Sequence, residues 1–355
     1  MGPGVIIVLE GNGKSLFSPH PSHFLPQSAA LSSLFSGVDV LGRSVLRRMI
    51  GRFLQAEVEW ISIAADATAD SGDLQAFDVE KVDFTTGSDL NLLIHSKLQE
   101  HLYRGIEHSF VVSANLYAET DILDMFYFHR EGRHTATRAT DREGVLDMWV
   151  VDCAKAQQFE PQELARKAQG TGTSYFIREY VNRLNHPRDL RRLACDALRR
   201  RCVMQPCGRE IKPGIWIDEN ADIHRKARVV APAYIGRAVK LREDTLITRC
   251  SNIEEGCYVD YGTVIEDASI LQNTHVGIWL DVCRAVVDGN RLVSLGRDAV
   301  LEISDPSILR STMHKETKVG WAGLNSSEAG NQASVFKKEE PLPASESLQL
   351  GANFS

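Results

Sequence analysis

The stretch IGRAVKLREDTLITRCSNIEEGCYVDYGTVIEDASIL, from Ile235 to Leu271, carries an aliphatic residue at every sixth position. The spacing begins upstream, and the full column is Ile217, Ile223, Val229, Ile235, Leu241, Ile247, Ile253, Val259, Ile265 and Leu271. Two positions before each member stands a mostly small residue: Ala221, Ala227, Ala233, Val239, Thr245, Ser251, Cys257, Thr263 and Ser269. A period of six matches neither an α-helix nor a flat strand. It matches a three-sided solenoid, in which each side contributes one inward aliphatic residue and each tight corner needs a small one.

After Leu271 the period shifts, because Val276 and Val282 each come one position early. We therefore expect a bulge or loop near residues 273–277. The pattern as a whole resembles the left-handed β-helix of the hexapeptide-repeat proteins, and the resemblance covers about residues 212–300.

The chain before the repeats predicts alternating strands and helices. Ser44 is a good N-cap for a helix that turns its apolar side chains inward and its arginines, Arg48 and Arg52 among them, outward. The order strand, helix, strand implies a parallel sheet with right-handed crossovers. The expected elements are a strand at Val5–Leu9, the helix after Ser44, a strand at Trp60–Ala64, a strand at Ser109–Val112, a helix at Asp121–His129 and a strand at Val145–Val151.

The patterns divide the chain into four parts. Residues 1–185 are expected to form the α/β domain, residues 186–211 a helical linker and residues 212–311 the β-helix. Residues 312–355 are rich in Ser, Glu, Lys, Asn and Gly with little apolar content, which predicts a disordered tail.

A glycine-rich loop, GNGKSLFSPHPSHFLP at residues 11–26, follows the first strand directly. Such a loop is the usual place for a parallel α/β sheet to hold phosphates, through backbone N–H groups. The candidate nucleotide-binding residues here are Gly11, Asn12, Gly13 and Lys14, with His20 and His23 close by. The alternative is that the glycines only turn the chain and that Lys14 and the histidines are solvated.

The order of several motifs resembles the sugar-1-phosphate nucleotidyltransferases, also called NDP-sugar pyrophosphorylases. Their motifs GGxGTRLxP, KPLLPV, GxPxL and Gly-Asp match, in order, Glu10–Leu16, Pro21–Pro26, Leu41–Leu46 and Ala114–Asn115. The resemblance implies an α/β nucleotidyltransferase-like (GT-A/Rossmann-like) domain followed by a left-handed parallel β-helix.

The departures from that family fall on charged residues of its active site. Ser15 replaces the loop arginine, Ser22 the lysine, Asn115 the metal-binding aspartate, and Gly170 a second such aspartate. Nucleotidyl transfer needs Mg²⁺ and fixed cations to neutralise the triphosphate as pyrophosphate leaves. The resemblance therefore implies a degenerate site, with Mg²⁺ held, if at all, by Asn115 and Asp121. Asp121 can equally cap its helix.

Three functions are compatible with these residues. The first is a nucleotidyltransferase-like protein of sugar-nucleotide metabolism that binds a nucleotide or nucleotide sugar with weak or no turnover; its catalytic residues stay unassigned. The second is a non-catalytic regulatory or scaffold subunit. The third is a hexapeptide acyltransferase that uses His275 or His224 of the β-helix as general base.

The composition and charge of the chain argue against several classes of binding partner. The net charge of −7 over 355 residues, with basic residues dispersed, argues against nucleic acid and anionic membranes. No apolar run is long enough to cross a bilayer, and the start lacks a signal-peptide pattern, so we expect a cytoplasmic protein.

Seven cysteines without a CxxC pair argue against disulfides and zinc. Flat solenoid faces favour a homo-oligomer formed through the β-helix.

Overall fold

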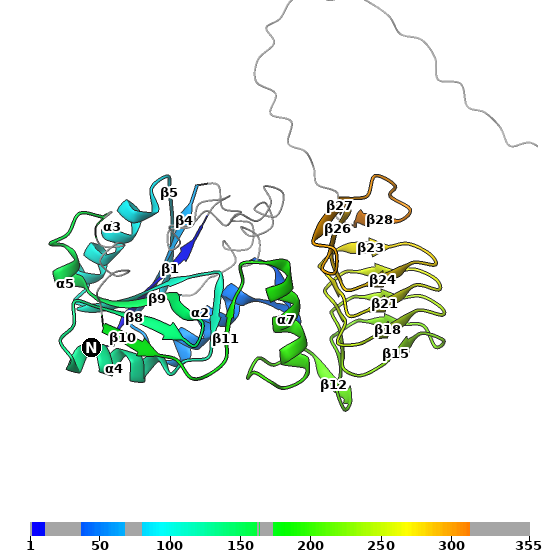
Figure 1. The fold of residues 1–355 in the computed structure, drawn as a ribbon, viewed down its shortest axis with the longest axis horizontal. Helices are drawn as coiled ribbons and strands as arrows, with labels where there is room; N and C mark the ends of the chain where they lie inside the picture. The colour runs from blue at the N-terminus through cyan, green and yellow to red at the C-terminus, as the bar shows by residue number, and fades with distance from the viewer. Residues whose placement is uncertain (1, 11–36, 68–79, 162, 164–172, 313–355) are drawn as a thin grey trace, which may run out of the picture. The chain divides into compact units, whose positions relative to one another are not determined.

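The apolar run at the start of the chain forms strand β1 (Gly4–Leu9), which is buried along its whole length. In the computed structural model, residues 2–10, 37–67, 80–161, 163 and 173–312 are described. Within them β1 belongs to a seven-stranded sheet of order β10-β8-β9-β6-β1-β4-β5 (Figure 1). Its other strands are β4 (Trp60–Asp66), β5 (Val82–Gly87), β6 (His108–Ser113), β8 (Ala136–Asp141), β9 (Gly144–Asp152) and β10 (Thr173–Phe176).

The sheet is mixed, which corrects the expectation of a parallel sheet. β1 pairs in parallel with β4 and β6, but β9 runs antiparallel to both β6 and β8. The reason is the short turn between β8 and β9, where Asp141 Oδ1 accepts the backbone N–H groups of Glu143 and Gly144 at 2.9 and 3.0 Å. A turn this short joins only antiparallel neighbours.

Helices cover both faces of this sheet because successive strand residues point to opposite sides. Val5 and Ile7 of β1 pack with α2 (Val45–Gln55) and α4 (Ile122–Glu131), while Ile6 and Val8 pack with α3 (Leu90–Tyr103) and α5 (Cys153–Ala156). The predicted cap of α2 is confirmed, since Ser44 Oγ accepts the N–H of Arg47 at 3.3 Å.

The repeat region, residues 209–311, consists mainly of short strands in three parallel sheets. The chain visits the sheets in turn, and each inner strand pairs with the strand three later, as Figure 1 shows for β15, β18, β21 and β24. The first sheet contains β13 (Ile215–Ile217), β16 (Ala233–Ile235), β19 (Asn252–Ile253), β22 (Ser269–Ile270) and β25 (Ala285–Asp288). The second contains β14 (Asp222–Ile223), β17 (Lys240–Leu241), β20 (Tyr258–Val259) and β23 (Thr274–Val276), and the third β15 (Arg228–Val229), β18 (Leu246–Thr248), β21 (Val264–Glu266) and β24 (Asp281–Cys283).

The two predicted columns form the interior of the repeat region. From Ile235 to Ile265 every aliphatic member is at most 2% exposed. The small members satisfy the corner backbone: Ser251 Oγ donates to Thr248 O at 2.6 Å, and Thr263 Oγ1 to Gly277 O at 2.6 Å.

The shift of period occurs one strand earlier than the sequence suggested. Ile253 pairs with Ile270, not with Leu271, and Val259 pairs with Val276. Ile270 therefore takes the inward position, and Leu271 packs in another cluster, against helix α7 (Pro187–Leu198). Because Ile270 and Leu271 are adjacent and both aliphatic, the spacing alone does not decide which of them points inward.

Antiparallel strands complete the repeat region at both ends. β12 (Arg209–Lys212) pairs with β13, and β26 (Arg291–Ser294) and β27 (Ala299–Glu302) extend the first sheet. β28 (Leu309–Ser311) pairs with β23.

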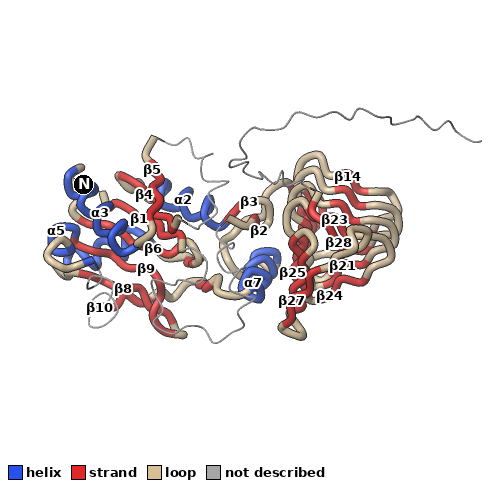
Figure 2. The backbone as a smooth tube through the Cα atoms, turned by 90° about the horizontal axis from the view of Figure 1, so that it is seen from above, coloured by secondary structure: helices blue, strands red, loops and turns tan. Residues whose placement is uncertain are grey.

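Residues 1–314 form one compact unit. Within it α7 lies beside β25 (Figure 2), and its Leu190 and Leu193 share a hydrophobic cluster with Val286 and Val293. A smaller contact is made by the hairpin β2 (Asp39–Val40) and β3 (Arg43–Ser44), whose turn residues Leu41 and Gly42 both have positive φ.

Glu254 of the repeat region closes that hairpin turn. The Leu41 and Gly42 N–H groups donate to its Oε1 and Oε2, each at 2.9 Å, and Asn252 Nδ2 donates to Oε1 at 2.7 Å. Position 42 needs glycine, because a Cβ there would lie 2.2 Å from the Tyr234 hydroxyl. A buried carboxylate thus positions the segment that leads into α2.

Candidate functional site

The carboxyl ends of β1, β4 and β6 meet at one edge of the sheet. Val8 pairs with Ala64 and with Ser113, and the chain after β6 stays beside β1 because Ala114 N donates to Val8 O at 2.9 Å. This edge is where a parallel α/β sheet holds ligands. The predicted loop residues Gly11, Asn12, Gly13 and Lys14, together with Ser15, Ser22, His20 and His23, lie outside the described residues.

Asn115 stands at this edge, directly after β6. Its backbone N–H donates to Ser113 Oγ at 3.2 Å, and its carbonyl accepts from Leu184 N at 2.9 Å. Its side-chain Oδ1 is buried and has no hydrogen-bond partner in the described part of the chain. Asn115 therefore presents an unused neutral oxygen where a carboxylate would carry a full charge.

The strand that pairs with β7 carries an arginine. β7 (Leu116–Ala118) pairs antiparallel with β11 (Val181–Arg183), which sets Arg183 opposite Leu116. Arg183 is already paired with Asp141 at 2.5 Å and with Glu143 at 2.9 Å. Burial, the largest single effect, raises the pKa of Asp141, but the hydrogen bonds from Arg183 and from the Glu143 and Gly144 N–H groups, together with the charge of Arg183, hold that pKa below its usual value.

Asp121, the other predicted metal ligand, is the N-cap of α4. Its Oδ1 accepts the N–H groups of Leu123 and Asp124, each at 3.0 Å. The residue is exposed, and its geometry is that of an ordinary helix cap.

A Mg²⁺ site requires several oxygen ligands, usually including carboxylates. Among the described residues no group of three or more His, Cys, Asp or Glu side chains could hold a metal ion. Gly170, the position matched to a second metal-binding aspartate, lies outside the described residues. Asn115 Oδ1 is thus a neutral oxygen at an edge where Asp66 ends β4 and Glu10 follows β1.

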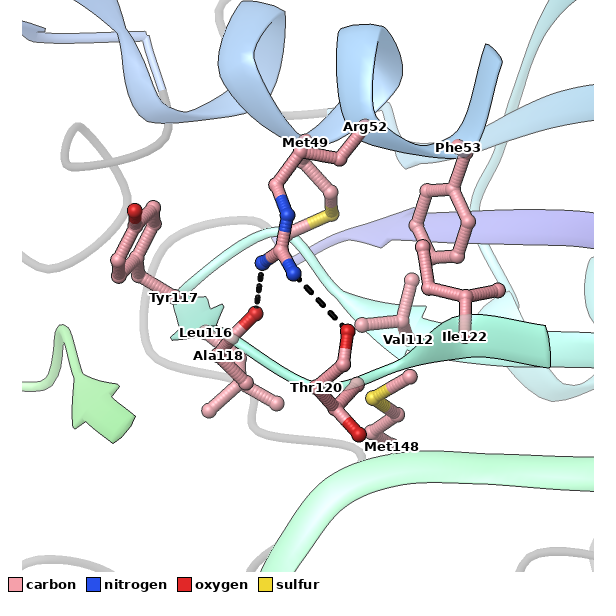
Figure 3. A pocket seen from close by; sticks show the side chains of 10 residues that line it. All are labelled: Met49, Arg52, Phe53, Val112, Leu116, Tyr117, Ala118, Thr120, Ile122 and Met148. Carbon is pink, nitrogen blue, oxygen red and sulfur yellow. Dashed lines mark hydrogen bonds between the residues drawn. The ribbon is translucent and has the colours of Figure 1, made fainter. Parts of the chain in front are cut away.

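A pocket enclosing about 390 Å³, including the part open to solvent, lies between α2 and β7 (Figure 3). Its walls are apolar and include Met49, Phe53 and Met148. Arg52 reaches into it and donates to the carbonyls of Ala118 and, at 2.9 Å, Thr120. Arg52 was expected to face solvent; instead it satisfies the carbonyl of the last residue of β7 and a carbonyl two residues further on.

The two histidines considered for acyl transfer lie in different surroundings. His275 is 6% exposed, stacks on Tyr258 with ring centroids 5.2 Å apart, and pairs through β23 with Arg310 of β28. Burial and the charge of Arg310 lower the pKa of His275. His224 is partly exposed, and its Nδ1 accepts from Lys226 N at 3.4 Å. His275 is covered, so it is poorly placed to meet a bulky acyl donor.

A search of solved structures found similar chains, among them two structures at low sequence identity. Two structures of HddC from Yersinia pseudotuberculosis align with a TM-score of 0.39 each. The first is 16% identical and covers 53% of this chain and 96% of its own; the second, complexed with GMP-PN, is 14% identical and covers 54% and 97%. No protein-family model and no curated protein sequence matches the chain. The function proposed for this chain therefore rests on its own residues.

The described residues contain no helix long and apolar enough to cross a membrane. They also show what the sequence did not reveal about the site. Arg52 and Glu254 both act through backbone groups of distant segments, and their sequence neighbours give no signal of this. A local signal is Gly42, two residues before the Ser44 cap, because glycine adopts the positive φ of such a turn without strain.

Proposed function

We propose that this chain is a nucleotidyltransferase-like protein of sugar-nucleotide metabolism, which binds a nucleotide or nucleotide sugar and turns it over weakly or not at all. The proposal is supported by the position and surroundings of Asn115. It stands at the carboxyl end of β6 with a buried, unpartnered Oδ1, in the place of the metal-binding aspartate of the family that the sequence resembles.

The electrostatics at this edge explain the expected loss of turnover. An amide oxygen coordinates Mg²⁺ without the negative charge that favours a divalent cation. Removal of one group that stabilises developing charge typically costs about 3 kcal/mol of transition-state stabilisation. Ser15 and Ser22 would remove two further charges in the same reaction.

The proposal also covers how the strands of the repeat region wind. We propose that its three sheets wind as a left-handed β-helix of hexapeptide repeats, which is supported by the inward column and by the order in which the chain visits the sheets.

A non-catalytic regulatory or scaffold role is a second candidate, and one observation favours it. Glu254 joins the repeat region to the turn before α2 through two backbone hydrogen bonds. A joint of this kind suits a subunit that uses both regions to bind partners. A regulatory or scaffold role predicts that a bound nucleotide is neither hydrolysed nor transferred.

The test is Asn115→Asp in the full chain, with calorimetric titration of nucleoside triphosphates and NDP-sugars with and without Mg²⁺. We expect the parent to bind a nucleotide with little dependence on Mg²⁺ and to release no pyrophosphate when sugar-1-phosphates are added. The variant should bind the triphosphate about tenfold more tightly in Mg²⁺, equivalent to about 1.4 kcal/mol, because a carboxylate brings a full negative charge to the metal contact.

Asn220→Asp is the matched control, since Asn220 is an exposed turn residue of the repeat region and the substitution changes the net charge equally. It should leave the Mg²⁺ dependence unchanged. Rapid Mg²⁺-dependent pyrophosphate release by the parent would refute the degenerate site. Absence of binding to every nucleotide and nucleotide sugar tested would refute the binding role.

A further inference from the structure

The apolar pocket between α2 and β7 has no part in the proposed nucleotide function. With its solvent-open part it encloses about 390 Å³, in the lower part of the range of roughly 300–1,000 Å³ that is typical of small-molecule sites. Met49 and Phe53 line it from α2, Val112 from β6 and Met148 from β9, and all four belong to the same hydrophobic cluster. Because packing in this cluster holds the walls in place, the pocket is preformed.

Three polar side chains also line the pocket. Tyr117 is already engaged, since its hydroxyl donates to Glu119 Oε1 at 2.8 Å. Thr120 is 5% exposed, and its Oγ1 is buried without a hydrogen-bond partner in the described part of the chain. Arg52 extends from α2 across the pocket towards Ala118 and Thr120 (Figure 3). The polar groups open to a ligand are therefore a hydroxyl and a guanidinium.

The charge of Arg52 is not neutralised by its present contacts. Its Nη1 and Nη2 donate to the carbonyls of Ala118 and Thr120, which carry no net charge, and among the described residues it forms no ion pair with a carboxylate. A guanidinium has five N–H donors, so further donors are available. Arg52 is half-buried beside apolar walls, where an anion is attracted more strongly than it would be in bulk water.

We propose that this pocket binds a small organic carboxylate whose body is a single ring or a short branched chain. The carboxylate accepts hydrogen bonds from Arg52 and from the Thr120 hydroxyl, and the body lies against Met49, Phe53 and Met148. One cation matches one negative charge. A phosphate monoester carries nearly two charges and three acceptor oxygens, which a single arginine and a hydroxyl do not satisfy. This site stands independently of the proposed nucleotide function.

The methionines of the pocket allow a test that reports the position of the ligand. The full chain is labelled with ¹³C at the methionine methyl groups and titrated with benzoate, and separately with benzamide, which has a similar shape but no charge. Ring currents of bound benzoate should shift the methyl signals of Met49 and Met148. The signal of Met204, which lies in a different hydrophobic cluster, should stay in place.

The charge of the ligand should decide its affinity. A Kd of about 0.1–1 mM is expected for a ligand as small as benzoate. Benzamide should bind roughly tenfold more weakly or less tightly still, because a hydrogen bond to a charged partner is worth about 1.5–3 kcal/mol and a neutral one less.

Substitutions separate the charge of the pocket from its shape. Arg52→Gln should remove the preference for benzoate over benzamide, while Arg52→Lys, which keeps the charge, should retain part of it. Arg43→Gln is the matched control, since Arg43 is exposed just before α2 and the same charge is lost. Ala118→Leu places a larger side chain at the pocket wall and should weaken both ligands. Circular dichroism checks that each variant is folded.

The comparison of the two ligands on the parent protein decides the proposal even if a variant fails to fold. The proposal is wrong if benzoate at a roughly tenfold excess over the expected Kd leaves the Met49 and Met148 signals unmoved. Equal affinity for benzamide would also contradict it. Shifts of the same two signals by a nucleoside triphosphate would overturn it as well, because the pocket would then be part of a nucleotide site. Failure of every nucleotide to bind refutes only the proposed function.

Discussion

Replacement of Ile247 by aspartate is expected to unfold the repeat region. Ile247 is 0% exposed in β18 and lies between Val229 and Ile265, its partners in the strands on either side. An unpaired charge in this column costs about 3–5 kcal/mol, a large part of the 5–15 kcal/mol that stabilises a typical domain. Thermal denaturation followed by circular dichroism should show the loss.

Leu246→Asp is the control for this prediction. Leu246 is the preceding residue of the same strand, so its side chain points to the opposite face, where it is half-buried. The cost there should be about 1 kcal/mol or less. If Ile247→Asp melts like the parent protein, the inward column is assigned to the wrong face.

Alanine at position 254 is the second substitution with a large expected effect. It would leave the Leu41 and Gly42 N–H groups and the Asn252 amide without their acceptor. Each buried donor left unsatisfied costs about 1–3 kcal/mol, so we expect a loss of roughly 3 kcal/mol or more. The free energy of unfolding, measured in urea, gives the value.

Glu254 also makes stability depend on pH. Complete burial raises its pKa from 4.5 to about 7, although the donors from Asn252, Gly42 and Leu41 act in the opposite direction. The folded state thus binds this proton more tightly than the unfolded state. The stabilisation from protonated Glu254 is complete below pH 4.5 and falls by roughly 3 kcal/mol as the pH rises to about 7.

Glu254→Gln should remove that component from the curve of unfolding free energy against pH. The control is Glu255→Gln, because Glu255 forms a surface ion pair with Arg237 at 2.8 Å, which is worth at most about 1 kcal/mol. Parallel curves for the parent and Glu254→Gln between pH 4.5 and 7 would show that Glu254 does not titrate in this range.

Local pattern was sufficient to predict the elements whose residues act on their immediate neighbours. Ser44 caps α2 through the N–H of Arg47, three residues away, and the spacing of six is a property of consecutive corners. These features were confirmed because backbone geometry repeats along the chain. The loop residues Gly11 to Lys14 remain a sequence prediction, since they lie outside the described residues.

Strand direction and register depended on longer-range contacts. The apolar run in β9 is compatible with either direction, and the turn after Asp141 makes it antiparallel. Ile270 and Leu271 are both aliphatic, and pairing with Ile253 selects Ile270 for the interior. Periodicity reports which residues are apolar but not which of two adjacent ones meets the neighbouring strand.

The sequence by itself determined the repeat region and the α/β character of the first domain, because both follow from residue type and spacing. Only the tertiary structure decided that Glu254 closes the turn at Leu41 and that Arg199 Nε donates to Cys250 Sγ. The members of these pairs are separated by tens to hundreds of residues. Their chemistry arises from burial and from donors on other segments, and neither is encoded in the residues next to them.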